Sequence, residues 1–260
     1  MVAILSNQRE AILEAVRLMY TDVATAPERG FHFPTGRIAC EFVGYPAEQL
    51  DAVPKAALES FAGVGYPFAA AVIQRRDTVL DIGSGAGTDA LIASALVGPE
   101  GRVIGLDMTD AMRAKLRDNV AAARATNIEV LEGNAEDIPL PNECVDVVTT
   151  NGVLNLVLDK PRAIREIVRV LASGGRLQLA DIVVETLPSE ACRARPELWA
   201  ECVVGATTLA AYVDEFSAAG LCDVEMINRV DYFSASSSAE TRKVAGSFGA
   251  HSIVLMGHKP

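Results

Sequence analysis

A glycine-rich turn holds the residues of this 260-residue chain that are best suited to chemistry. The turn reads D-I-G-S-G-A-G over residues 81–87 and follows a short apolar segment. Glycines at alternate positions let the backbone turn sharply and let a ligand approach the main chain closely. Asp107 lies twenty residues after the last of these glycines, where a carboxylate can accept hydrogen bonds from both hydroxyls of a ribose. The spacing therefore predicts a nucleoside-binding site.

The acidic residue Asp81 narrows the choice of nucleoside. Dinucleotide sites use the spacing G-x-G-x-x-G, whereas this turn has G-x-G-x-G with Asp81 two residues before the first glycine. A carboxylate beside the turn would repel a pyrophosphate, but it would suit a ligand that carries an ammonium and a sulfonium group. The pattern therefore favours a positively charged nucleoside.

Alternating strands and helices must position these residues. From Thr78 onward the hydrophobic pattern predicts strands over Thr78–Ile82, Arg102–Asp107, Ile128–Leu131, Val145–Thr149 and Arg176–Val183. The intervening helices are expected over Ala90–Val97, Asp110–Arg124 and Asp159–Leu171. Such alternation predicts an α/β fold, in which a doubly wound parallel sheet carries helices on both faces.

The two ends of the chain differ from this pattern. Val224–Tyr232 and Ser252–His258 are expected to be strands that form an antiparallel pair at the sheet edge, joined by a short helix near Ala239–Gly246. A helical insertion is expected over about 189–219. Residues 1–75 are expected to form an N-terminal helical cap, which begins with a helix over Ser6–Ala24, and residues 76–260 the ligand-binding domain. Cap and insertion together would form a lid.

Composition limits the partners of the chain. The net charge is −11, from 23 basic and 34 acidic residues, which argues against nucleic acid because phosphates need a basic face. No segment reaches the roughly 20 apolar residues of a membrane-spanning helix, and no signal-peptide core is present. Five cysteines without a C-x-x-C pair or metal-type spacing predict free thiols, no metal site and a cytoplasmic location.

Four motifs resemble the successive motifs of class I S-adenosylmethionine-dependent methyltransferases between Thr78 and about Val183. They are D-I-G-S-G-A-G at 81–87, G-L-D-M-T at 105–109, G-N-A-E-D-I-P at 133–139 and L-A-S-G-G-R-L at 171–177. The resemblance implies a Rossmann-like seven-stranded sheet with S-adenosylmethionine as cofactor and S-adenosylhomocysteine as product. It also implies a cofactor site. The turn at the methionine part would be formed by Asp81, Gly83, Ser84, Gly85 and Gly87. Asp107 would bind the ribose, Met108 would lie beside the adenine, Ala135 and Glu136 would lie at the adenine edge, and Asn151 would lie near the methyl group. Glu136 as a solvated loop acid and Met108 as core packing stay open as alternatives.

A narrower resemblance links the chain to the arsenite methyltransferases. It rests on residues 97–112, on N-G-V-L-N-L at 151–156 followed by Asp159-Lys160, and on W-A-E-C-V-V-G-A at 199–206. In that subfamily thiolates hold As(III) while its lone pair attacks the methyl carbon. Cys202 matches one of the metalloid-binding cysteines, whereas Gly152 and Val64 stand where the subfamily has two others. Cys40 is a possible further thiol.

The methyl acceptor therefore has more than one candidate. A small-molecule acceptor other than a metalloid would need groups such as His32 as a base, Tyr66 as a contact and Arg37 as a partner for an acidic group. A metalloid acceptor would use Cys202, with Cys40 as a further candidate thiol. A third reading is a protein that binds S-adenosylmethionine without turnover. We expect Cys202, His32 and Tyr66 as candidate catalytic residues in a monomer or homodimer.

Overall fold

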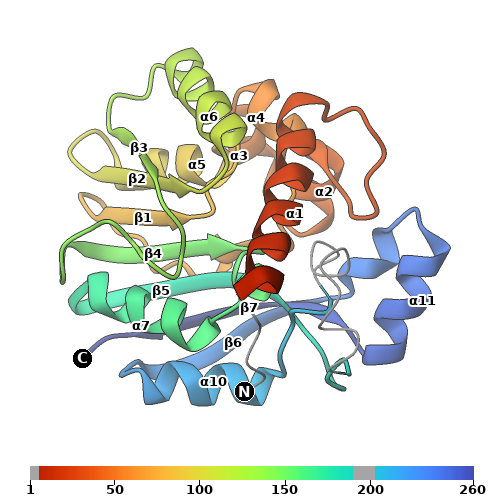
Figure 1. Ribbon diagram of the computed structural model, residues 1–260. Helices are drawn as coiled ribbons and strands as arrows, with labels where there is room; N and C mark the ends of the chain where they lie inside the picture. The colour runs from red at the N-terminus through yellow and green to blue at the C-terminus, as the bar shows by residue number, and fades with distance from the viewer. Residues whose placement is uncertain (1–5, 190–202) are drawn as a thin grey trace.

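The computed structural model describes residues 6–189 and 203–260, which form one twisted sheet with helices on both faces (Figure 1). Its strands run in the order β3-β2-β1-β4-β5-β7-β6. They are β1 Thr78–Ile82, β2 Arg102–Asp107, β3 Ile128–Glu132, β4 Val145–Asn151, β5 Leu171–Val183, β6 Cys222–Val230 and β7 His251–His258. The first five strands are parallel, and β7 is antiparallel to both β5 and β6. The predicted α/β, Rossmann-like sheet of seven strands with an antiparallel last strand is thereby confirmed.

Helices connect and cover these strands. The domain contains α5 Thr88–Val97, α6 Asp110–Ala123, α7 Lys160–Val170, α10 Leu209–Ala218 and α11 Ala239–Phe248, with 3-10 turns at η1 Pro67–Ala70, η2 Leu154–Leu156 and η3 Tyr232–Ala235. The N-terminal segment contains α1 Ser6–Thr25, α2 Gly36–Phe42, α3 Ala47–Asp51 and α4 Lys55–Glu59. None of the helices within the described ranges is both long and apolar enough to cross a membrane.

Alternation along the strands divides the core into two layers. Val79 and Val103 face α5 and α6, whereas their neighbours Leu80 and Ile104 face the layer that contains α7 and α10. This follows from the period of two in a strand, where successive side chains point to opposite faces. All four side chains are at most 2% exposed, which shows that the sheet is covered on both sides.

Several boundaries differ from the predicted ones: β6 is Cys222–Val230 instead of Val224–Tyr232, and β5 differs most. β5 begins at Leu171, directly after α7, because Leu171 pairs with Val145 before a register shift brings Arg176 opposite Val147. The glycine pair at 174–175 thus lies within β5 instead of preceding it. In the predicted insertion, α10 and residues 203–208 lie within the described ranges, and the rest of the insertion, 190–202, lies outside them.

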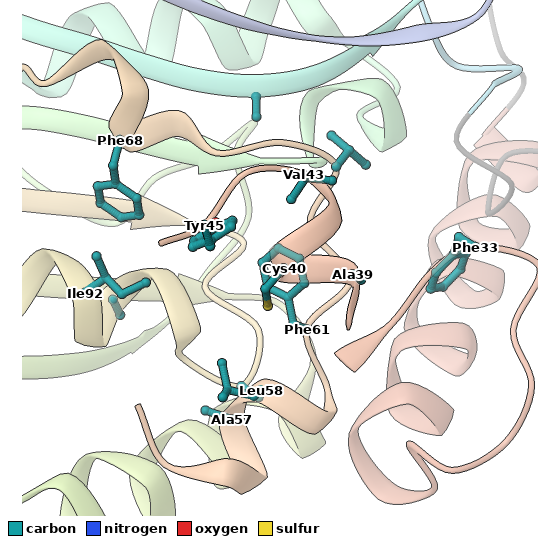
Figure 2. Close-up of a cluster of buried hydrophobic side chains, with 14 of the residues drawn as sticks. Phe33, Ala39, Cys40, Val43, Tyr45, Ala57, Leu58, Phe61, Phe68 and Ile92 are labelled. Carbon is teal, nitrogen blue, oxygen red and sulfur yellow. The ribbon is translucent and has the colours of Figure 1, made fainter. Parts of the chain in front are cut away.

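The N-terminal segment shares a core with the sheet. Tyr45, Phe61 and Phe68 lie in one buried cluster with Ile92 of α5, as Figure 2 shows. Lys115 of α6 strengthens this contact, because its Nζ donates to the Ala24 carbonyl at 2.9 Å and to Ser60 Oγ at 2.7 Å. The segment is therefore packed against the domain that it was expected to cover.

Candidate active site

A cavity opens where the order of the parallel strands reverses, at the carboxyl ends of β1, β2 and β4. Such a switch point is where open α/β sheets bind their ligands. Nine of the ten predicted cofactor-binding residues line this cavity: Asp81, Gly83, Ser84, Gly85, Asp107, Met108, Ala135, Glu136 and Asn151. The structure thus brings together residues that are up to 70 positions apart in the chain.

Gly87, the tenth of these residues, lies behind the cavity at the start of helix α5. It is the N-cap of α5 and has a φ of +98°, a conformation that favours glycine. A Cβ built on it would lie 2.3 Å from Leu116 Cδ1 of α6. Gly87 therefore permits close packing of α5 and α6, and it does not line the cavity itself.

The Asp107 carboxylate is held in place by backbone amides. Its Oδ2 accepts a hydrogen bond from Gly85 N at 2.9 Å, and its Oδ1 accepts one from Thr109 N at 2.8 Å. Burial raises the pKa of this carboxyl group, and the two amides oppose that shift. Each carboxylate oxygen has a second lone pair, so Asp107 can still accept hydrogen bonds from a ribose.

Asp81 differs from Asp107 because it lacks such support. Its side chain is 1% exposed, and its Oδ2 has no hydrogen-bond partner among the described residues; nor does the Ser84 hydroxyl beside it. Burial raises the pKa of Asp81 well above its usual value. A buried carboxylate oxygen without a partner is costly, and a cation from a ligand would remove this cost. The site therefore fits the positively charged end of S-adenosylmethionine.

Helix α1 covers the side of the cavity where the adenine is expected. Arg9, Leu13, Val16 and Tyr20 recur at helical spacing and line it, and Figure 1 shows α1 crossing near the ends of the strands. Arg9 forms an ion pair with Glu136, which also accepts a hydrogen bond from Asp159 N at 3.2 Å. Glu136 is 6% exposed, so it is not the solvated loop acid of the alternative interpretation.

Sequence reasoning missed a polar triangle at the end of the cavity where the methionine part is expected. Tyr45 donates a hydrogen bond to Asp89 Oδ1 at 2.5 Å, and Asn151 Nδ2 lies 3.0 Å from both Asp89 Oδ2 and the Tyr45 oxygen. Burial raises the pKa of Asp89 to about 6, while the bonds from Tyr45 and Asn151 lower it. The only sequence signal was an acid in the first helical turn after the glycines, which is also common in ordinary helices.

His32 and Tyr66, the two candidate catalytic residues within the described ranges, do not line the cavity. His32 packs edge-on against Phe33, and Tyr66 donates a hydrogen bond to Gln49 at 3.1 Å; neither lines the cavity. Their catalytic role stays a prediction without support from the cavity. Arg37 is paired with Glu41 and Asp51, also away from the cavity.

None of the cysteines within the described residues lines the cavity. Cys40 lies inside the buried cluster of Figure 2, does not line the cavity, and has its pKa raised by burial, which disfavours a thiolate. Cys202 lies outside the described residues. Within the two described ranges, no group of three or more His, Cys, Asp or Glu residues could hold a metal ion.

Comparison with known proteins agrees with this geometry. A family model described as a methyltransferase domain matches residues 73–237. The arsenite methyltransferase of Halobacterium salinarum is 41% identical over 179 residues, which are 67% of this chain and 45% of that protein. A demethylmenaquinone methyltransferase of Listeria monocytogenes is 34% identical over 116 residues, 45% of this chain and 49% of that protein. The chain spans about half the length of the curated relatives that it matches.

A solved structure extends the similarity beyond the matched domain. The arsenic (III) S-adenosylmethionine methyltransferase of Chlamydomonas reinhardtii superimposes with a TM-score of 0.60 at 27% identity, over 86% of this chain and 73% of that one. The chain therefore belongs to the methyltransferase domain family. Its fold is that of a class I S-adenosylmethionine-dependent methyltransferase that resembles the arsenite methyltransferases, and S-adenosylmethionine is its cofactor.

Proposed function

We propose that this chain transfers the methyl group of S-adenosylmethionine to a small-molecule acceptor that is not held by thiolates. The observation that carries the proposal is the contact between Gly152 and Val64, the two positions where the arsenite methyltransferases have cysteines. Gly152 lines the cavity, and a Cβ built on it would lie 3.3 Å from Val64 Cγ1. Two thiols of a metalloid site would meet at this place, and the chain has neither.

The conformation of Gly152 also opposes a thiol at this position. Its φ is +73°, a region that a residue with a Cβ rarely adopts. Val64 is 1% exposed and fills the adjoining space with an apolar side chain. As(III) is thiophilic, and a site with Cys202 alone would hold it weakly. This corner of the cavity therefore suits an organic acceptor better than a metalloid.

When bound, S-adenosylmethionine supplies an electrophilic methyl group on a sulfonium sulfur. The residues of the chain bind and orient the reactants. Asp107 would accept hydrogen bonds from the ribose hydroxyls, and Asp81 would face the cationic methionine part. The backbone of the glycine-rich turn would lie against the ligand. The lone pair of the acceptor would form the new bond to carbon while the S–C bond breaks and its electrons stay on sulfur. Positioning supplies most of the rate enhancement in such a displacement.

The N-terminal segment supports a small acceptor by enclosing the site. Phe61, Ala62 and Gly63 line the cavity from one side, and Leu13 and Val16 of α1 line it from another. We propose that this segment, together with the insertion, is the lid over the acceptor pocket. A mostly apolar pocket that such a lid closes would exclude water from the reaction.

Transfer assays with Cys202→Ser test the proposal. Wild type and variant are incubated with radiolabelled S-adenosylmethionine and either arsenite with a dithiol or a panel of small organic acceptors, quinols included. Cys222→Ser is the matched control, because Cys222 is exposed. We expect transfer to an organic acceptor at the same rate in all three proteins and none to arsenite. Arsenite methylation that Cys202→Ser abolishes would overturn the proposal, and tight cofactor binding without any transfer would favour the non-catalytic alternative.

A metalloid acceptor is the second candidate, supported by the similarity to the Halobacterium salinarum arsenite methyltransferase. A gain-of-function variant distinguishes a metalloid acceptor from an organic one. Val64→Cys places a thiol next to Gly152 without changing the backbone at that glycine. If Cys202 already serves a metalloid site, this variant should raise arsenite methylation above that of wild type. If the acceptor is organic, the variant should leave arsenite unmethylated.

A further inference from the structure

Two carboxyl groups share the methionine end of the cavity, and only one of them was expected there. Asp81 is 1% exposed and Asp89 is 6% exposed, and both line the cavity. Among the described residues, neither is paired with a basic side chain. The charge of Asp89 further raises the pKa of Asp81, after burial as the main cause. Two buried carboxylates repel each other unless a cation lies with them.

The other carboxylates of the cavity are already engaged. Asp107 accepts hydrogen bonds from two backbone amides, and Glu136 is paired with Arg9. Arg9 is the one basic residue among those described that line the cavity, and its charge is committed to the adenine side. A cation that balances Asp81 and Asp89 in their charged forms would therefore come from the ligand.

Tyr45 and Asn151 fix the orientation of Asp89. Tyr45 is 4% exposed, and its ring packs edge-on against Phe61 and Tyr66 at centroid distances of 5.2 and 4.7 Å. Its hydroxyl therefore has little freedom to leave Asp89 Oδ1, which it contacts at 2.5 Å. Asn151 Nδ2 contacts the other oxygen at 3.0 Å. Each oxygen keeps a lone pair that a ligand in the cavity can use.

We propose that Asp89 binds the α-ammonium group of S-adenosylmethionine together with Asp81, and that Tyr45 is the positioning residue that holds Asp89 for this task. The glycine-rich turn and Asp107 recognise an adenosine, which many ligands contain. The pair of acids adds a requirement for a free amino group on the side chain attached to sulfur. The proposal rests on the cofactor and does not depend on which acceptor is methylated.

Calorimetry with two ligands isolates this contact. S-adenosylhomocysteine carries the α-ammonium group, and its deamino analogue, 5′-S-(3-carboxypropyl)-5′-thioadenosine, has hydrogen in its place and keeps the carboxylate. For Asp89→Asn, we expect the affinity for S-adenosylhomocysteine to fall roughly tenfold or more, as for loss of a hydrogen bond to a charged group. The affinity for the deamino analogue should not change. Tyr45→Phe should also lower the affinity for S-adenosylhomocysteine relative to that for the deamino analogue, but by a smaller factor.

Two control variants separate this role from a structural one. Asp107→Asn should weaken both ligands by the same factor, because both carry the ribose. Asp118→Asn, an exposed change on α6, should alter neither. Equal weakening of both ligands by Asp89→Asn, or no weakening of either, would overturn the proposal. If Asp89→Asn fails to fold, the ratio of the affinities of Tyr45→Phe for the two ligands tests the proposal instead. The acceptor assays above are unaffected by either result.

Discussion

Asn151 and Gly65 are joined at both polar atoms of the asparagine amide. Asn151 Nδ2 donates to the Gly65 carbonyl at 2.9 Å, and Asn151 Oδ1 accepts from Gly65 N at 3.2 Å and from Val64 N at 2.8 Å. One side chain at the end of β4 thus fixes the backbone of the N-terminal segment beside the cavity. The same amide contacts Asp89, so the segment and the ammonium site share one anchor.

Loss of this anchor should destabilise the protein and weaken cofactor binding together. Asn151→Ala leaves the Gly65 amide and carbonyl without their partner, which should lower the free energy of unfolding by about 2–3 kcal/mol. Urea unfolding monitored by circular dichroism measures this change. The matched control is Asn228→Ala on the exposed strand β6, which should lie within about 0.5 kcal/mol of wild type. Equal stability of the two variants would contradict the role of Asn151.

The Arg9–Glu136 ion pair should slow release of the cofactor product. Arg9→Ala removes the partner of a buried carboxylate and loosens α1 over the adenine side of the cavity. We expect S-adenosylhomocysteine to dissociate several-fold faster, with a smaller change in its association rate. Stopped-flow displacement measures both rates. Arg17→Ala, on the exposed face of the same helix, is the control, and equal dissociation rates in the two variants would show that the ion pair does not close the site.

Asp181 should make the stability depend on pH. It accepts a hydrogen bond from Tyr212 at 2.5 Å, and burial raises its pKa from 3.8 to about 6. Because the folded carboxyl group holds its proton more tightly than the unfolded one, its contribution favours folding below pH 4 and is lost as pH rises through 6. The loss is roughly 2–3 kcal/mol. In Asp181→Asn, the free energy of unfolding should vary less between pH 4 and 7, whereas Asp118→Asn should follow the wild-type curve.

The sheet and the glycine-rich turn could be predicted because their signals are local. Each strand is a short apolar run, and the carboxyl ends of parallel strands meet at one edge, so Asp81, Asp107 and Asn151 converge without any knowledge of the loops. Glu136 was placed at the same edge on the resemblance alone. The pairing with Arg9 was not foreseen, because it joins residues that are 127 positions apart.

The contribution of the N-terminal segment was harder to predict, because it depends on contacts between residues that are far apart in the chain. Tyr45 meets Asp89 across 44 positions and Asn151 across 106, from a segment whose irregular sequence shows no periodicity. His32 and Tyr66 were chosen by residue type, since histidine and tyrosine can exchange protons, but residue type does not fix direction. The structure turns Phe61, Ala62 and Gly63 of that segment toward the cavity instead.

Cofactor affinity should rise with pH if Asp89 binds an ammonium group. The titratable groups around Asp89 are Asp81 on β1, Cys40 on α2, and Tyr45 and Tyr66 in the N-terminal segment. Burial raises the pKa of the thiol and of both phenols, so these three stay neutral below pH 8. The titration of Asp89, whose pKa burial raises to about 6, governs the range near pH 6. Below about 6 a protonated Asp89 cannot balance the ammonium charge. The dissociation constant for S-adenosylhomocysteine should therefore decrease from pH 5 to 7.5, and the deamino analogue should show a flatter profile; parallel profiles for the two ligands would contradict an ammonium contact.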